Sequence, residues 1–180
     1  MDAYKQEWTR LQNEIFRFLC IKSDQDFNLR GISKFLDVSP TAVSKALKQL
    51  EEKKLIKIEK SKVMNLMSIK LNRDNYSIIE LKRTENLKLI YESNLVDFVE
   101  NKFPGCTIIL FGSYSRGEDI YSSDIDIAII GSKEKDLNLS KYNKFLERDI
   151  SLNFYSDWKI KNNLKNNILN GIILRGSIEL

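Results

Sequence analysis

Histidine is absent from the 180 residues of this chain, and only two cysteines occur, Cys20 and Cys106. Without histidine there is no Ser/His or Cys/His catalytic pair and no imidazole ligand for a transition metal. The two cysteines lie far apart in the sequence and show no metal-type spacing, so we expect them to pack as small apolar residues in a reducing compartment. Any chemistry must therefore use carboxylates, hydroxyls, lysines and a bound cation.

Long apolar runs are also missing. No window approaches the roughly 18 consecutive apolar residues of a membrane helix, and the N-terminus MDAYKQEWTRLQ lacks the apolar core of a secretion signal. A composition of 42% hydrophobic and 30% charged residues with only two prolines is that of an ordinary globular protein. We therefore expect a cytoplasmic protein that has no membrane partner.

Charge is distributed unevenly along the chain. Residues 1–73 carry 15 Lys and Arg against 9 Asp and Glu, a net charge of +6, while residues 74–180 carry 14 against 16, which is −2. A basic half followed by a slightly acidic half indicates two domains, with an anionic polymer as a candidate partner of the first. We predict an N-terminal domain over 1–73, a helical connector over 74–104 and a C-terminal domain over 105–180.

The basic half shows three helical patterns followed by two extended ones. Apolar residues recur at three- and four-residue spacing over 4–21 and 29–37. Ser39 followed by Pro40 is a start signal for a third helix, because serine caps a helix and proline fits its first position. After Lys54 the apolar residues alternate, as they do in strands. Three helices and a two-stranded ribbon are the elements of a winged helix-turn-helix, in that order.

The stretch FNLRGISKFLDVSPTAVSKALKQLEEKKLIKIEK resembles winged-helix transcription regulators, both in the turn around Asp37–Ser39 and in the LEEKKLI entry to the wing. The resemblance covers about residues 10–72 and implies a third helix that enters the major groove of double-stranded DNA, commonly in a homodimer. The candidate DNA contacts are outward residues of that helix and lysines of the wing: Thr41, Ser44, Lys45, Lys48, Lys57, Lys60 and Lys62. The alternative is that these lysines form a solvated face of a domain that binds protein or dimerises.

Two further helical segments are expected outside the basic half. Residues 77–103 have helical apolar spacing, with a break at Ser93–Asn94 and an end at Pro104–Gly105. We interpret their apolar positions as core between the two domains. The tail from Ser156 to Asn170 has the pattern of a polar helix, with Ser156 as its cap.

A glycine-serine turn follows the first strand expected in the acidic half. Thr107 to Phe111 is a short apolar run between Pro-Gly and Gly-Ser, which predicts a buried strand. Gly112 has no side chain to block the approach of an anion, and Ser113 offers a hydroxyl and a backbone N–H to phosphate oxygens. Ser115 and Arg116 extend this polar loop. The loop is therefore a candidate phosphate site.

Ten residues separate Ser113 from the sequence Asp124-Ile125-Asp126, which opens a second apolar run. Side chains alternate faces along a strand, so Asp124 and Asp126 should point the same way and Ile125 into the core. Two carboxylates held in this way can bind Mg²⁺, whose preferred ligands are carboxylates and phosphate oxygens. The alternative, exposed aspartates at a sheet edge beside a turn glycine, leaves two carboxylates in a very apolar strand without a partner.

Gly112-Ser113, ten residues and Asp124-x-Asp126 together resemble the signature of the DNA polymerase beta nucleotidyltransferase superfamily, in particular its minimal nucleotidyltransferase branch. The resemblance covers about residues 86–180 and implies a small mixed-sheet domain, so that the whole chain has an α+β fold. It implies transfer of a nucleoside monophosphate from a nucleoside triphosphate to a hydroxyl. Asp124 and Asp126 are then the catalytic and Mg²⁺-binding residues, and the nucleotide-binding candidates are Gly112, Ser113, Ser115 and Arg116.

Catalytic members of that superfamily use a third carboxylate, usually on a neighbouring strand. The corresponding strand here is expected at 150–155, where Ser151 and Asn153 stand at the metal-facing positions and neither is charged. Asp149 has the same parity just before the strand. It is either a carboxylate that reaches the site or an exposed helix-end residue beside Arg148.

Three functions fit these observations. The first is a nucleotidyltransferase with an unknown acceptor, coupled to a DNA-binding domain. The second is a transcription regulator whose nucleotidyltransferase-like domain senses a nucleotide without chemistry, which the missing third carboxylate favours. The third is an antitoxin-like protein that nucleotidylates a toxin partner, against which the attached winged helix argues mildly.

Overall fold

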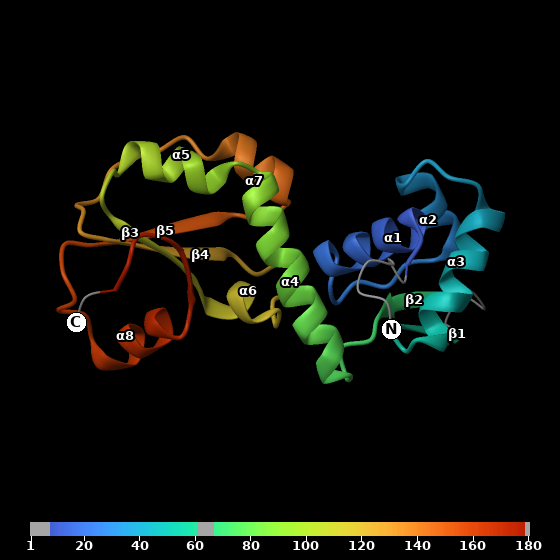
Figure 1. The fold of residues 1–180 in the computed structure, drawn as a ribbon. Coiled ribbons are helices and arrows are strands. Elements are labelled where there is room, and N and C mark those ends of the chain that lie inside the picture. The colour runs from blue at the N-terminus through green and yellow to red at the C-terminus, as the bar shows by residue number, and fades with distance from the viewer. Residues whose placement is uncertain (1–7, 61–66, 179–180) are drawn as a thin grey trace. The chain divides into compact units, whose positions relative to one another are not determined.

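The computed structural model describes residues 8–60 and 67–178 and divides the chain into two compact units, Met1–Ile78 and Ile79–Leu180. Both units mix helices with a β-sheet, which confirms the predicted α+β class (Figure 1). Lys62, a candidate contact to DNA, lies outside the described residues. The predicted domain boundaries at 73 and 104 stay a prediction.

The first unit contains three helices and a two-stranded ribbon in the predicted order. Its elements are α1 (Arg10–Ile21), α2 (Leu29–Phe35), α3 (Pro40–Glu52), β1 (Ile56–Lys60) and β2 (Met67–Leu71). Each helix is capped by a side chain that accepts a hydrogen bond from the first turn: Thr9, Asn28 and Ser39, respectively. The start signal predicted at Ser39 and Pro40 is therefore confirmed.

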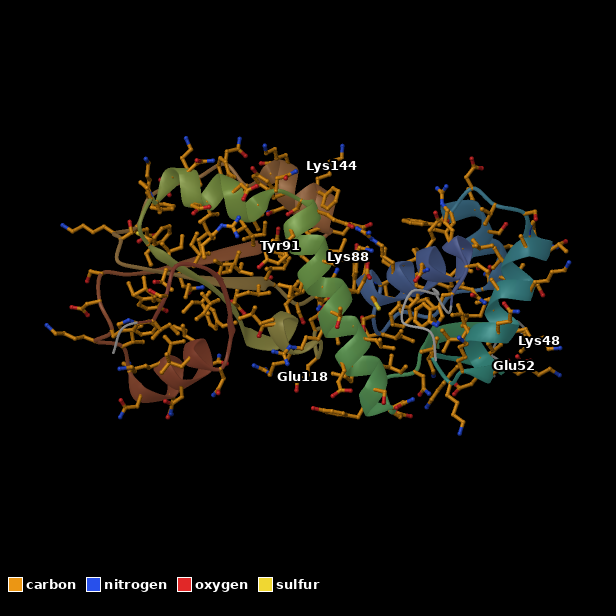
Figure 2. The ribbon with its side chains drawn as sticks, in the orientation of Figure 1. Lys48, Glu52, Lys88, Tyr91, Glu118 and Lys144 are labelled. Carbon is orange, nitrogen blue, oxygen red and sulfur yellow. The ribbon has the colours of Figure 1, made fainter. Side chains whose placement is uncertain are left out.

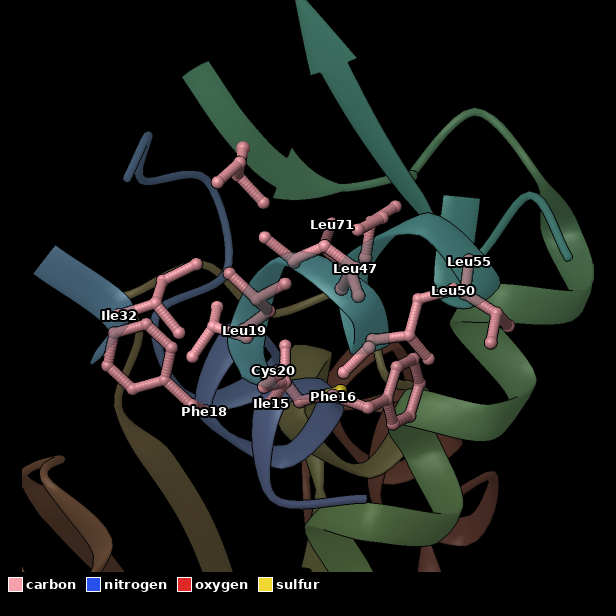
Figure 3. Packing of buried hydrophobic residues seen from close by; sticks show 14 of the residues in the cluster. Ile15, Phe16, Phe18, Leu19, Cys20, Ile32, Leu47, Leu50, Leu55 and Leu71 are labelled. Atoms are coloured by element: carbon pink, nitrogen blue, oxygen red, sulfur yellow. The ribbon is translucent and has the colours of Figure 1, made fainter. Parts of the chain in front are cut away.

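The core of this unit is apolar and lies where the helices meet the ribbon. β1 and β2 pair antiparallel, with Ile58 opposite Ile69, and Phe27 adds an isolated bridge to Ile69. Figure 3 shows how Leu19 of α1 and Leu47 of α3 meet inside this cluster. Because each helix and strand contributes one apolar face to the same cluster, the unit has a core of its own.

Helix α4 (Tyr76–Glu92) begins in the first unit and continues into the second, where α5 (Leu95–Lys102) follows it. The break expected at Ser93–Asn94 is confirmed, since Asn94 adopts a left-handed conformation with φ of 58°. Within the second unit, α5 is tied to the last strand by Arg175, which binds Asp97 and Glu100 at 2.9 and 2.8 Å.

The second unit is built on a four-stranded mixed sheet with the order β5-β4-β3-β6. Its strands are β3 (Thr107–Phe111), β4 (Ile125–Ile130), β5 (Ile150–Tyr155) and β6 (Ile172–Arg175). β3 runs antiparallel to both β4 and β6, while β4 and β5 are parallel. The helices added here are α6 (Gly112–Arg116), α7 (Ser140–Leu146) and α8 (Asn162–Leu169).

The two faces of this sheet are covered by different helices (Figure 1). One face packs under α8, where Ile168 meets Phe111 and Ala128. Residues of the other parity point to the side of α5 and α7, as the contact between the rings of Phe103 and Phe154 at 5.2 Å shows. Asp126 has the parity of Ala128, so its carboxylate lies on the α8 face. Among the described residues no helix is long and apolar enough to span a membrane.

Candidate active site

The end of β3 brings Gly112 against the carboxylate of Asp126. Phe111 pairs with Asp126 in the antiparallel register, so the next residue lies beside that side chain. Gly112 has φ of +76°, and a Cβ atom there would stand 2.5 Å from Asp126 Oδ2 and 3.3 Å from its Cγ. The backbone conformation therefore favours glycine, and a side chain at this position would displace the Asp126 carboxylate.

The residues after Gly112 form a short helix, α6, where the sequence predicted a polar loop. The hydroxyl of Ser115 is buried and donates to the carbonyl of Gly112 at 2.8 Å, while Ser113 is half-buried. Arg116 is exposed and donates to Glu118 at 2.7 Å and to Asn167 of α8 at 3.3 Å. All four candidates for nucleotide binding are thus in one turn, with Ser115 already bonded within it.

The two aspartates stand at the start of β4. Asp124 is exposed and directly precedes the strand, and Asp126 is its second residue and is half-buried. Ile125 between them is fully buried, as the strand parity predicted. Burial, followed by the negative charge of Asp124, raises the pKa of Asp126 above its ordinary value. A cation bound between the two carboxylates would remove this repulsion, so the pair fits a divalent metal.

The α8 face of the sheet supplies an apolar wall beside Asp126. Tyr155, Trp158 and Leu164 pack against the cluster under α8. Burial, and then the charge of Asp126, raises the pKa of the Tyr155 hydroxyl. The Asp126 carboxylate is therefore partly withdrawn from water, so charges placed against it are less screened than at the surface.

No carboxylate occupies the strand position beside Asp126. Ser151 pairs with Asp126 in the parallel register and Asn153 pairs with Ala128, as the sequence predicted. Asp149 precedes the strand, and its carbonyl accepts from Ile125 N at 2.8 Å while its side chain accepts from Asn143 at 3.1 Å. Within residues 8–60 and 67–178, no three acidic or sulfur side chains are close enough to hold a metal ion together.

A shallow pocket of about 260 Å³ nevertheless brings Asp149 to the same place as Asp124. Its lining consists of the loop before β4 and the segment before β5: Tyr121, Ser122, Ser123, Asp124, Asn143, Glu147, Arg148 and Asp149. The pocket is therefore acidic at its rim and contains one arginine.

Sequence reasoning missed a buried group of charges beside this pocket. Lys82, Asp119 and Arg148 are 0%, 1% and 5% exposed, and Asn86 is 2% exposed. Lys82 and Asn86 lie on the buried face of α4 in line with Ile78, because positions four apart share a face of a helix. Polar residues at such apolar positions were the signal that could have found the group.

The candidate DNA contacts of the first unit are mainly on its surface. Thr41, Ser44, Lys45 and Lys48 are all exposed on α3, and Figure 2 shows Lys48 on the outer side of that helix. Lys60 is exposed at the end of β1. Lys57 forms an ion pair with Asp74. The hydrogen bond from Lys57, and then its positive charge, hold the pKa of the Asp74 carboxyl below its ordinary value.

Comparison with known proteins agrees with this geometry. Residues 92–174, which include the Gly112 turn, both aspartates and all four strands down to Leu174, match the family model of the nucleotidyltransferase domain. No curated protein matches the chain.

Solved structures similar to this chain include winged-helix proteins. They are ZitR of Lactococcus lactis (23% identity over 57% of this chain and 68% of that chain, TM-score 0.42), AdcR of Streptococcus pyogenes (22%, 56% and 72%, 0.43) and MepR of S. aureus in complex with DNA (20%, 53% and 82%, 0.40). With TM-scores below 0.5, the winged-helix assignment rests on the order of α1, α2, α3, β1 and β2 themselves. The chain therefore contains a nucleotidyltransferase domain over residues 92–174, preceded by a unit of winged-helix element order.

Proposed function

We propose that the second unit binds a nucleoside triphosphate with Mg²⁺ and transfers its nucleotidyl group to an acceptor hydroxyl, while the first unit binds double-stranded DNA. One observation carries the proposal: Gly112 lies against Asp126, so the turn suited to phosphates and the carboxylates suited to a cation share one site. A metal between them would touch both carboxylate and phosphate oxygens, which is the usual mode of Mg²⁺ in nucleotide sites.

Different residues of the site would bind the cation and the phosphates. Asp124 and Asp126 hold the cation, and Ser113 with the backbone of the Gly112 turn binds the outer phosphates. The guanidinium of Arg116, already oriented by Glu118, neutralises phosphate charge. When bound, Mg²⁺ stabilises the charge that develops on the phosphate oxygens during transfer.

The acceptor needs a base because its hydroxyl proton must leave as the oxygen attacks the α-phosphorus and pyrophosphate departs. Histidine is absent from the chain, and a carboxylate is a general base available in this pocket. Asp149 lines the pocket that contains Asp124 and comes from the neighbouring strand segment, which makes it the proposed base.

The test is labelling of an acceptor with an NTP radiolabelled at the α-phosphate, with cell extract or DNA as the acceptor source. Label should transfer only with Mg²⁺, and the variant Asp124→Ala with Asp126→Ala should show none. The Arg175→Ala variant, which loses two surface ion pairs of β6, is the matched control and should label normally. Labelling by the double-aspartate variant would contradict the assigned site.

The DNA-binding part of the proposal rests on charge and on α3. Residues 1–73 carry a net charge of +6, and four polar residues of α3 face solvent together. A basic unit with an exposed third helix has the footprint of a major-groove reader.

The uncharged Ser151 beside Asp126 favours a second candidate, a regulator that senses the nucleotide without chemistry. In that case a nucleoside triphosphate changes the affinity of the chain for DNA, and no pyrophosphate is released. Fluorescence anisotropy on a DNA pool, run beside a pyrophosphate assay, separates the two candidates. Stoichiometric pyrophosphate release excludes the sensor.

A further inference from the structure

A buried ion cluster connects α4 with both halves of the candidate active site. Lys82 forms an ion pair with Asp119 in which both side chains have no exposed surface, and Arg148 NH2 lies 3.6 Å from the other oxygen of Asp119. Asn86 donates to Asp119 Oδ1 at 2.7 Å and to the carbonyl of Tyr114 at 2.9 Å. Asp119 is thus contacted from α4 and from the segment before β5.

The first half of the site reaches the cluster through α6. Tyr114 directly follows Ser113, its carbonyl accepts a hydrogen bond from Asn86, and the centre of its ring lies 5.9 Å from Lys82 Nζ. Figure 1 shows α6 beside α4 accordingly. The turn proposed to bind phosphates is therefore fixed to α4.

The second half reaches the cluster through the loop that carries Asp119. Gly117 (φ +75°) lies so close to α4 that a Cβ atom there would stand 2.7 Å from Arg83 N. After Asp119, Ile120 and Ser123 close a turn by two hydrogen bonds of 3.0 Å, and Asp124 follows directly. The loop before Asp124 therefore packs against α4 at Gly117 and ends in the hydrogen-bonded turn from Ile120 to Ser123.

Arg148 joins the cluster to the pocket beside Asp124. Its guanidinium lies 5.1 Å from the centre of the Tyr121 ring, and both residues line the pocket with Asp149. Arg148 therefore belongs both to the cluster and to the pocket lined by Asp124 and Asp149.

Such a cluster is a poor way to gain stability. Removing charges from water costs several kcal/mol per ion, and well-packed apolar residues of the same volume are often as stable or more so. We propose that the Lys82–Asp119–Arg148 cluster is a positioning device, in which Asp119 fixes the distance between the phosphate turn at Gly112–Ser113 and the carboxylate of Asp124, while the pairing of β3 with β4 places Asp126. The inference rests on the proposed function, because it concerns the same site.

If the cluster positions the two halves of the site, a bound metal ion should increase the affinity for the nucleotide, which is a coupling between metal and nucleotide. A cation that must touch both halves of the site binds more tightly with nucleotide present only if the halves are held at the right separation. The measurement is the Kd of a fluorescent, non-hydrolysable NTP analogue with and without Mn²⁺, corrected for the complex formed in solution. We expect Mn²⁺ to tighten binding at least tenfold in the wild type, in the range that supporting residues of metal sites control.

Two variants test the cluster. Asp119→Asn keeps the shape and should reduce the coupling to about threefold or less, while the Arg175→Ala control keeps it. The triple variant Lys82→Met, Asp119→Leu and Arg148→Met removes all three charges together and so leaves none of them buried without its partners, which makes it the variant expected to fold if Asp119→Asn does not; it should also lose the coupling. Thermal unfolding followed by Trp158 fluorescence verifies the fold of each variant.

Each result has one meaning. Wild-type coupling in the folded triple variant overturns the positioning role and leaves the proposed function intact. Absence of nucleotide binding in the wild type with Mn²⁺ overturns the proposed function and the positioning role together. If the wild type and the Arg175→Ala control show the coupling and the two cluster variants lose it, the result supports both the proposed function and the positioning role.

Discussion

The two units differ in what they bury. Among the described residues, the polar side chains buried in the first unit are neutral: Gln12, Ser23 and Ser33. The second unit buries Lys82, Asp119 and Arg148 together with Asn86 and Ser115. Charges of the first unit thus stay in water, where they can meet a charged partner, whereas the second unit keeps charges inside, where they are weakly screened and hold their neighbours in place.

Breaking the buried cluster at one partner should have the largest effect. Lys82→Met leaves Asp119 buried with less compensation, and removal of one partner of such a pair costs about 3–5 kcal/mol of the free energy of unfolding. Urea unfolding should show this loss in the second unit alone.

The two tryptophans allow this separation, because Trp8 packs on Phe16 in the first unit and Trp158 under α8 in the second. The Trp8→Phe background therefore reports on the second unit and Trp158→Phe on the first. Lys45→Met on the surface of α3 is the control, with no change expected in either transition. An equal loss of stability in both units would contradict the comparison.

Gly112→Ala should have the next largest effect. Alanine in this left-handed conformation costs about 1–2 kcal/mol, and its methyl group displaces Asp126 Oδ2. Gly105→Ala is the matched control, since Gly105 has φ of +80° with nothing within 4 Å of its added Cβ. Both variants should lose the stability that a left-handed alanine costs, but only Gly112→Ala should lose nucleotide binding by isothermal titration. Equal nucleotide affinity in the two variants would remove Gly112 from the site.

On the first unit, Lys45→Ala with Lys48→Ala should weaken DNA binding without changing stability. If both lysines neutralise phosphates, the plot of the logarithm of the DNA-binding constant against the logarithm of the salt concentration becomes shallower, and the magnitude of its negative slope decreases by about 2. Anisotropy titrations between low and moderate salt measure this slope, with Lys144→Ala on α7 as the control (Figure 2). An unchanged slope would favour the reading in which these lysines form a solvated face.

The smallest effect concerns pH. Because the pKa of Asp126 is raised in the folded chain, the folded state binds its proton more tightly than the unfolded state does. In EDTA, the wild type should therefore lose stability relative to Asp126→Asn as the pH rises from below about 4. The loss should be complete once the pH exceeds the folded pKa. Added Mg²⁺ should stabilise the wild type and leave Asp126→Asn unchanged, and identical pH profiles in EDTA would show that the carboxylate is well solvated.

The sequence predicted elements whose cause is local. The run from Thr107 to Phe111 forms β3 with those bounds, and the parity of Asp126 and Ser151 was correct because side-chain alternation is fixed by strand geometry. The cap proposed at Ser156 was wrong, since α8 begins at Asn162. The segment between Ser156 and Asn162 instead packs Trp158 and Ile160 against the apolar cluster of the sheet.

What the sequence did not predict depends on contacts between distant segments. Lys82 is one of many lysines in a helical stretch, and nothing beside it shows that Asp119, 37 positions later, will lie against it. The helical form of α6 was missed for a related reason, because Asn86 holds the carbonyl of Tyr114 from another element. Local propensity is a weak guide where tertiary contacts fix the backbone.

The contact between Gly112 and Asp126 also limits which substitutions can accumulate at these two positions during evolution. A lineage that keeps the Asp126 carboxylate in this position should keep glycine, because a side chain at position 112 displaces the carboxylate. A lineage that replaces Asp126 by a small residue loses that obstacle and can accept asparagine at position 112, since asparagine tolerates the left-handed backbone. Among descendants of this domain that have lost the reaction, we therefore expect Gly112 and Asp126 to be replaced together.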